Sequence, residues 1–232
     1  MRRLFSLAGI ACVAATGLFA GPALAVTIWT DWTSVTLGAN GGGSAAGTLG
    51  SVGVSYSGEL DNAVINGSSS IWSPNSSFIG GTSTTSPSSA GDDLRLNGSS
   101  TGINTITFSS AVDDPLIAIW SLGAPGIAAS FTFDATPTVE AGGPNSSFGG
   151  ASITVAGNVV SGNEGNGVVR FAGTFTSISW TNSFENFYAF TVGIAEAAPT
   201  PAPEPATLAL LGVALAGLGY SRRRKQAALS SR

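Results

Sequence analysis

The stretch "SVGVSYSGEL", Ser51 to Leu60, alternates between apolar residues and small or polar ones. One side of an extended chain would carry Val52, Val54 and Tyr56, and the other would carry Gly53, Ser55 and Ser57. Successive side chains of a β-strand point to opposite faces, so a period of two predicts a strand with one buried face. This pattern favours an antiparallel sheet in which one face is packed and the other meets solvent.

The same period recurs along the chain between clusters of Gly, Ser, Thr and Asn. It is found in "DDLRLNG" (92–98), "ASFTFDA" (129–135), "ASITVAG" (151–157) and "NFYAFTVGI" (186–194). The stretch "DDPLIAIWSLG" (113–123) is apolar on both faces and therefore predicts a central strand. Residues 26–200 show no helical period. We expect an all-β domain, an antiparallel two-sheet β-sandwich of jelly-roll type.

Two segments rich in Ser, Gly, Pro and Asn, residues 66–91 and 140–150, are predicted to be loops at the rim of the sandwich. The first is long for a connection without secondary structure. Its four large apolar residues, Ile71, Trp72, Phe78 and Ile79, predict that it packs against the domain.

The N-terminus has the pattern of a secretory signal peptide, residues 1–25. Arg2 and Arg3 precede a short apolar stretch, and the small residues Ala23 and Ala25 precede the expected cleavage site. We expect cleavage after Ala25.

The C-terminus has a second apolar segment, residues 206–220, after a Pro/Ala linker at 196–205. As a helix, its 15 residues would span roughly 22 Å, less than the bilayer core of about 30 Å. The basic tail 221–232 contains Arg222, Arg223, Arg224 and Lys225, which would act as a stop signal and keep the tail in the cytoplasm. We therefore expect a short transmembrane helix that is a weak anchor, with the domain at 26–195 outside.

Pro203, Glu204 and Pro205, followed by this apolar segment and the basic residues, resemble the PEP-CTERM sorting signal of Gram-negative bacteria that make extracellular polysaccharide. The resemblance implies recognition by a membrane-embedded exosortase, a transient anchor in the inner membrane, and delivery to the cell surface or the extracellular space. Three stretches in the middle of the chain, 105–123, 162–181 and 187–193, are similar to segments of other proteins with this signal. The resemblance implies no activity.

Charge and cysteine content restrict the function further. Between the signal peptide and the basic tail, two basic residues stand against thirteen acidic ones, a net charge of −11. Such a chain repels nucleic acid, so we expect no nucleic-acid partner. The only cysteine is Cys12, in the predicted signal peptide, so stability should come from packing rather than from disulfides.

The exported part also contains no His and no Lys, which excludes Ser-His-Asp, Cys-His and Schiff-base mechanisms. Carboxylates remain, but Asp92 with Asp93 and Asp113 with Asp114 are adjacent in sequence, and neighbouring strand residues point to opposite faces. The sequence "GNEGNG" (162–167) lacks the Lys and the helix of a phosphate loop and predicts a hairpin turn. We expect no enzyme activity.

Calcium is the metal that this exported chain would suit best, because its ligands are hard oxygen donors. The candidate ligands are Asp31, Asp92, Asp93, Asp113, Asp114 and Glu164. No known calcium motif appears, and no other cofactor is expected. Of the five tryptophans we expect most in the core, and Trp72, in the long polar loop, is the candidate glycan contact. Sequons at Asn66, Asn75, Asn97 and Asn145 indicate surface positions.

These observations lead to one function and one alternative. We expect an exported, exosortase-processed protein of the cell surface or extracellular matrix with a structural or adhesive role. The alternative is a carbohydrate-binding module for exopolysaccharide that calcium could stabilise.

Overall fold

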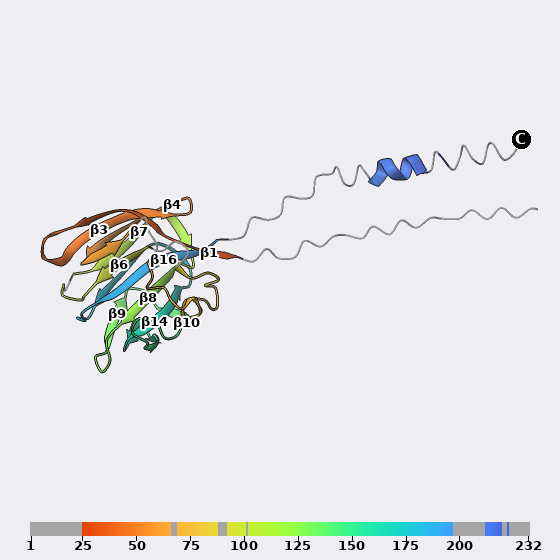
Figure 1. Ribbon diagram of the computed structural model, residues 1–232. Helices are drawn as coiled ribbons and strands as arrows, with labels where there is room; N and C mark the ends of the chain where they lie inside the picture. The colour runs from red at the N-terminus through yellow and green to blue at the C-terminus, as the bar shows by residue number, and fades with distance from the viewer. Residues whose placement is uncertain are drawn as a thin grey trace, which may run out of the picture. The chain divides into compact units, whose positions relative to one another are not determined.

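The computed structural model describes residues 25–65, 69–87, 92–100, 102–196, 212–219 and 222. The chain divides into two units, residues 24–198 and the two chain ends, and every strand lies in the first. In the second unit, residues 212–219 are helical (Figure 1). Among the described residues, no helix has the length and apolar character that crossing a membrane requires. Residues 1–24 of the predicted signal peptide, and residues 206–211 and 220 of the predicted span, lie outside the described residues.

The strands form two sheets of eight. The first sheet has the order β10 (Pro137–Gly142), β14 (Gly165–Phe171), β8 (Leu116–Leu122), β16 (Tyr188–Glu196), β6 (Asp93–Leu96), β5 (Asn62–Val64), with β1 (Val26–Trp29) beside β16 and β11 (Ala151–Ser152) beside β14. The second has the order β12 (Thr154–Ala156), β13 (Val159–Gly162), β9 (Ala129–Phe133), β15 (Thr174–Asn182), β7 (Asn104–Asp113), β4 (Val52–Glu59), β3 (Gly42–Leu49), β2 (Asp31–Leu37). Two short 3-10 helices, η1 (Ala39–Gly41) and η2 (Asn75–Ser77), interrupt the connections. All pairs are antiparallel except β11 with β14, so the expected antiparallel two-sheet architecture is confirmed.

Eight strands pair in a nested order. β6 pairs with β16, β7 with β15, β8 with β14, and β9 with β13, and successive pairs alternate between the two sheets. Strands β13 to β16 thus pair with β9 to β6, in reverse order along the chain. This is the pairing order of a jelly roll. The strands β10 to β12 are inserted between β9 and β13.

Aromatic side chains from both sheets form the core between them. Phe190 of the first sheet lies 5.2 Å from Tyr56 and 5.1 Å from Trp180 of the second, measured between ring centres. Phe133 and Phe171 bridge the sheets in the same way at 4.9 Å. The alternation in β4 is confirmed, because Val54 and Tyr56 are buried in this core.

A second hydrophobic cluster covers the outer face of the first sheet. All seven residues of β8 are buried, which confirms the prediction of a central strand. The segment 69–87 supplies the cover, since Ile71, Trp72 and Phe78 are buried against side chains of β8 and β14. Ile79 differs from the expectation and is largely exposed. The loop predicted from residue 140 begins later, because residues up to Gly142 belong to β10.

Candidate functional site

The two ends of the sandwich domain lie side by side. Val26 pairs with Glu196 across β1 and β16, so the segment after the predicted signal peptide and the segment before the sorting tail meet at one end of the domain. We call the opposite end, where β16 begins at Tyr188, the distal end. Trp180 pairs with Asn104, which brings the loop before β7 to the same end.

Three loops lie at the distal end: 97–100 with 102–103, 123–128, and 183–187. The backbone N–H of Glu185 donates to the carbonyl of Asn97 at 2.8 Å. The N–H of Ser183 donates to the carbonyl of Ser130 at 3.0 Å, beside the second loop. The loop 123–128 follows β8, whose Trp120 pairs with Ala189 at the start of β16, so all three loops lie at the same end of the domain. We call their surface the distal surface.

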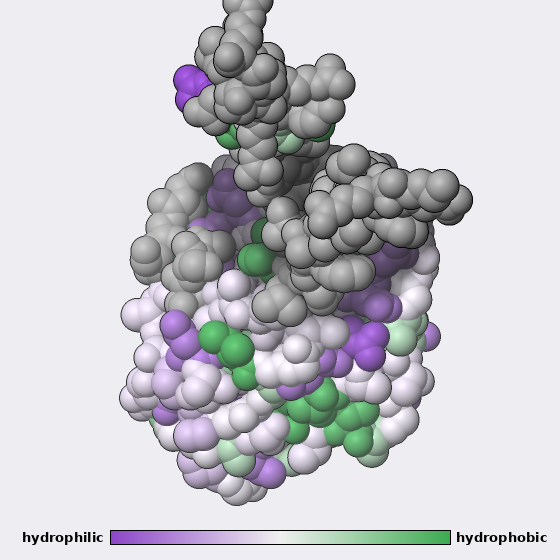
Figure 2. Space-filling view, turned by 90° about the vertical axis from the view of Figure 1, so that its right-hand side faces the viewer, coloured by the Kyte–Doolittle hydropathy of each residue, from purple (hydrophilic) through white to green (hydrophobic). Residues whose placement is uncertain are grey.

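The distal surface exposes large apolar side chains. Ile103 and Phe184 are each 65% exposed, and Ile127 is 55% exposed. The face turned to the viewer in Figure 2 is largely pale, that is, weakly polar, with some green apolar and purple polar areas. Single exposed apolar residues are normal, but their presence on loops at one end of the domain is typical of an interaction site.

A buried carboxylate anchors the first loop. Glu59 Oε1 accepts hydrogen bonds from the backbone N–H of Ser99 at 2.8 Å and from its hydroxyl at 3.2 Å. Glu59 Oε2 accepts from the side-chain amide of Asn182 at 2.7 Å. The ion pairs among the described residues involve Arg95 and Arg170 and not Glu59. Hydrogen bonds thus compensate the burial of this carboxylate, and they hold the loop to the sandwich.

Two buried tyrosines complete this anchor. The Tyr188 hydroxyl donates to the Ser183 carbonyl at 3.1 Å, and the Tyr56 hydroxyl donates to Asn104 Oδ1 at 2.7 Å. Burial raises the pKa of both phenols well above the usual value, and the nearby Glu59 carboxylate adds to the effect. Both hydroxyls therefore stay protonated and serve as donors.

An aromatic group lies beside the distal surface, on the outer face of the first sheet. The Trp120 ring lies 5.5 Å from Phe148 and 5.4 Å from Phe187, and Phe148 is 58% exposed. The Arg95 guanidinium lies 5.3 Å from the centre of the Phe187 ring, a cation–π arrangement. The group therefore presents one aromatic side chain, Phe148, on a rigid base.

Two acidic residues are buried next to this aromatic group. Glu185 accepts from the N–H of Phe187 at 3.1 Å, and Glu164 accepts from the Ser121 hydroxyl. Burial raises the pKa of Glu185, and the negative charge of Glu164 raises it further. Each carboxylate is thus bonded to the protein itself, which gives it a role in holding the loops.

Trp72 is not a glycan contact of the folded domain, contrary to our hypothesis. Its side chain has 0% exposure, and its ring packs edge-on against Phe78 at 5.2 Å. The indole N–H donates to the carbonyl of Asp92 at 3.3 Å. Trp72 fills the space between its loop and the first sheet, because an indole in a polar segment gains more from burial than from exposure. The other four tryptophans are also buried.

The structure does not bring the candidate calcium ligands together. Among the described residues, no three or more side chains of His, Cys, Asp or Glu form a group that could hold a metal. The candidates are bonded elsewhere: Asp92 to the N–H of Trp32, Asp93 to Arg95, Asp113 to Thr174, Asp114 to Gly173 and Arg170, and Glu164 to Ser121. Asp31 is exposed at the start of β2. The geometry therefore lends no support to a calcium site.

Two smaller expectations also change. "GNEGNG" forms a turn, but it joins β13 in one sheet to β14 in the other and is not a hairpin. Asn145 is buried, and its amide donates to Asn166 Oδ1 at 3.0 Å, so this sequon is not a surface position. Arg95 and Arg170 have acidic partners, Asp93 and Glu140, at 2.5 and 2.8 Å.

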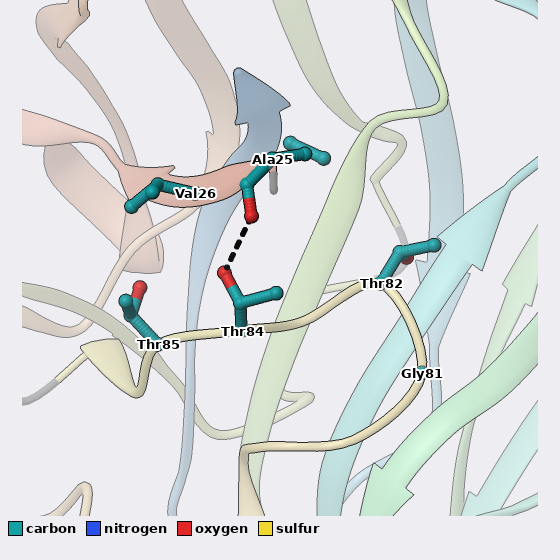
Figure 3. A pocket seen from close by; sticks show the side chains of 7 residues that line it. Ala25, Val26, Gly81, Thr82, Thr84 and Thr85 are labelled. Carbon is teal, nitrogen blue, oxygen red and sulfur yellow. Dashed lines mark hydrogen bonds between the residues drawn. The ribbon is translucent and has the colours of Figure 1, made fainter. Parts of the chain in front are cut away.

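Most of the predicted sorting residues lie outside the described residues: Ala23, Pro203, Glu204, Pro205, Arg223, Arg224 and Lys225. Ala25 and Arg222 are described. Ala25 borders a pocket of about 420 Å³, which is also lined by Val26, Gly81, Thr82, Thr84, Thr85 and Ala195 (Figure 3). The hydroxyl of Thr84 donates to the Ala25 carbonyl at 3.3 Å, so the bond expected to be cleaved lies at the start of β1.

Sequence reasoning missed the residues of the distal surface. Phe184 stands among polar residues in "TNSFEN" (181–186), where an aromatic residue was a detectable signal. Ile103 and Ile127 carry no such signal, since an isolated isoleucine near a turn is as often buried as exposed.

Comparison with known proteins finds a match in the C-terminal tail of the chain. Residues 201–225 match the family model described as the PEP-CTERM protein-sorting motif. Comparison with the curated proteins and with the solved structures finds no match. The motif is an exosortase recognition signal and implies export through the membrane to the cell surface. The chain thus carries a PEP-CTERM protein-sorting motif at residues 201–225.

Proposed function

We propose that the domain is a non-catalytic structural or adhesive protein of the cell surface or extracellular matrix, and that it contacts its partner through the distal surface. The observation that carries this proposal is the exposure of Ile103, Ile127 and Phe184 on loops at one end of the domain, the first of which is anchored by Glu59. The sorting tail is attached at the other end of the domain, after Glu196. A tethered domain would therefore have its distal surface free.

The charge of the exported part limits the kind of partner. A net charge of −11 opposes contact with anionic lipid and nucleic acid. An apolar contact surface avoids this repulsion, because its attraction depends on the area removed from water and not on charge. A weakly charged matrix component fits both conditions.

The roles of the acidic residues support a function without catalysis. Glycoside hydrolysis, the remaining mechanism, needs two carboxyl groups that face a substrate cleft. The buried carboxylates of Glu59, Glu164 and Glu185 accept hydrogen bonds from the protein itself. We therefore interpret these three carboxylates as groups that hold loops in place and not as catalytic groups.

For the tail, we propose that the segment 206–220 is a transient anchor in the inner membrane that an exosortase removes. The apolar segment of 15 residues is short for a lasting span. A strain that lacks exosortase should keep the full-length protein in its membrane fraction, and intact-mass measurement shows whether Arg222 to Arg232 remain. An unchanged mass and location in that strain would contradict the proposal.

A carbohydrate-binding module is the alternative function. The observation that favours it is the exposed ring of Phe148 on Trp120, together with Phe184, because aromatic rings stack on the apolar faces of sugars. With Trp72 buried, these two phenylalanines become the candidate glycan contacts.

One experiment distinguishes the structural or adhesive role from the carbohydrate-binding module. The protein exported from the full chain is tested for binding to the exopolysaccharide of the producing strain, with and without Ca²⁺, beside Phe148→Ala, Phe184→Ala and the control Val139→Ala. Val139 is exposed on β10, away from the distal surface. Loss of polysaccharide binding in the phenylalanine variants alone supports the module. Loss of cell or matrix adhesion without polysaccharide binding supports the adhesive role. Binding or adhesion that none of the variants changes would contradict the proposed contact surface. Release of reducing sugar would contradict the proposed lack of catalysis.

A further inference from the structure

The edges of the two sheets differ in how they are protected. An edge strand has unpaired N–H and C=O groups that can pair with another chain, and proteins usually cover such edges, shorten them or interrupt them. The described edge strands are β10, β11, β5 and β1 of the first sheet and β12 and β2 of the second. Each can be judged by its length and by what lies beside it.

The edge formed by β1 is covered by threonines. The hydroxyls of Thr84 and Thr85 approach Thr27: the Thr27 N–H donates to Thr84 Oγ1 at 2.8 Å, and Thr85 Oγ1 donates to the Thr27 carbonyl at 2.6 Å. The segment 81–85 thus runs along β1, as Figure 3 shows. The backbone N–H and carbonyl of Thr27, in the middle of this edge, are therefore occupied.

The other edges of the first sheet, and one edge of the second, are short or interrupted. β10 begins with a proline, contains a register shift between Val139 and Ala141, and has Thr82 bonded to Glu140. β5 and β12 have three residues each, and β11 has two. None of these strands offers a long, regular edge.

β2 is different. It has seven residues, and it is the last strand of its sheet. Asp92 accepts from the N–H of Trp32, but Thr33, Ser34, Thr36 and Leu37 are exposed and Val35 is half-buried. Among the described residues, no hydrogen bond links 34–37 to any strand but β3. The register of β2 against β3 shifts between Trp32 and Ser34, but from Ser34 to Leu37 it is regular, and these four residues include no Pro and no Lys.

We propose that the edge of β2 at residues 34–37 pairs with the same strand of a second copy of this chain. A two-fold axis makes the two copies of one strand antiparallel and so extends the second sheet across the dimer. This interface is separate from the distal surface and does not depend on the proposed function.

The charge pattern favours a second copy as the occupant. The stretch "TSVTL" (33–37) is uncharged, so two acidic domains can meet here without placing like charges opposite each other. The one charge of the strand, Asp31, stands at its start. With the axis near Val35, the two Asp31 side chains would lie about 26 Å apart at roughly 3.3 Å per residue, beyond the screening length of about 8 Å.

The test uses the protein exported from the full chain with Cys12→Ala, so that an introduced thiol is the only one present. Ser34→Cys, Val35→Cys and Thr36→Cys are compared with Thr154→Cys, which lies on β12 at the opposite edge of the same sheet. Mild oxidation should cross-link the chain at one or more of the three β2 positions and not at Thr154. Non-reducing gels and intact mass identify the covalent dimer.

A second measurement uses no thiol. Light scattering should show a reversible dimer of the parent protein, and the double variant Ser34→Glu with Thr36→Glu should weaken it about tenfold, because like charges then face each other. The control Thr154→Glu should leave it unchanged. A parent protein that stays monomeric, cross-linking equal at Thr154, or a dimer insensitive to the double variant would overturn the proposal. Tryptophan fluorescence identifies variants that misfold. If the double variant misfolds, the cross-linking of the cysteine variants decides whether β2 forms the interface.

Discussion

Replacing Trp72 by alanine tests whether the polar segment 69–87 is part of the folded domain or a free loop. The indole has 0% exposure and packs edge-on against Phe78. Its N–H bond to the Asp92 carbonyl would also be lost. The substitution thus removes the contact that joins the segment to the outer face of the first sheet.

The expected loss of stability is large. Deletion of a buried aromatic side chain costs about 3–5 kcal/mol, which includes the cavity that remains. A domain of this length has a total free energy of unfolding of about 5–15 kcal/mol. At roughly 2–4 °C per kcal/mol, the melting temperature should fall by about 6–20 °C.

The assay is urea or thermal unfolding of the exported protein, followed by circular dichroism. Phe184→Ala is the matched control, because it removes an aromatic ring that is largely exposed and should change stability by less than about 0.5 kcal/mol. A loss below about 1 kcal/mol for Trp72→Ala would refute the argument. So would a larger loss for Phe184→Ala than for Trp72→Ala.

Three further predictions concern the anchors of the domain. Burial raises the pKa of Glu185, so its folded form holds a proton more tightly, and its contribution to stability is lost as the pH rises from about 4. Thermal unfolding should therefore show that Glu185→Gln gains stability relative to the parent as the pH rises from about 4 to 7. A difference in melting temperature between the two proteins that does not change with pH would contradict this. Glu59→Gln should cost about 1–3 kcal/mol and speed amide exchange at Ser99, whereas unchanged exchange would argue against the anchor. A chain that ends at Phe187 lacks β16, which lies between β8 and β6, and limited proteolysis should find no resistant core, unlike a chain that ends at Glu196.

Much of the fold could be predicted because strands depend on a local pattern. The alternation in residues 51–60 and the apolar run in 113–123 were sufficient to predict one half-buried strand and one central strand. The burial of Trp72 could not be decided in this way. Its sequence neighbours are polar, and its packing partners belong to strands far along the chain.

The candidate site illustrates the same limit. Phe184, Ile103 and Ile127 are separated by up to 81 positions, and only the nested strand order brings their loops to one end. The fold can also keep candidate residues apart. The acidic residues proposed as calcium ligands suit the metal chemically, but the pairing of the strands places them at separate positions.

The sequence by itself determined the strand character of the domain, its acidic and thiol-free composition, and the PEP-CTERM motif at 201–225, since each depends on residues adjacent in the chain. Only the tertiary structure decided which tryptophans are buried, which loops share the distal surface, and which edge strand stays open. Those features depend on pairings such as Val26 with Glu196, across 170 positions of chain. No local pattern encodes such contacts, because they form only when the whole sandwich closes.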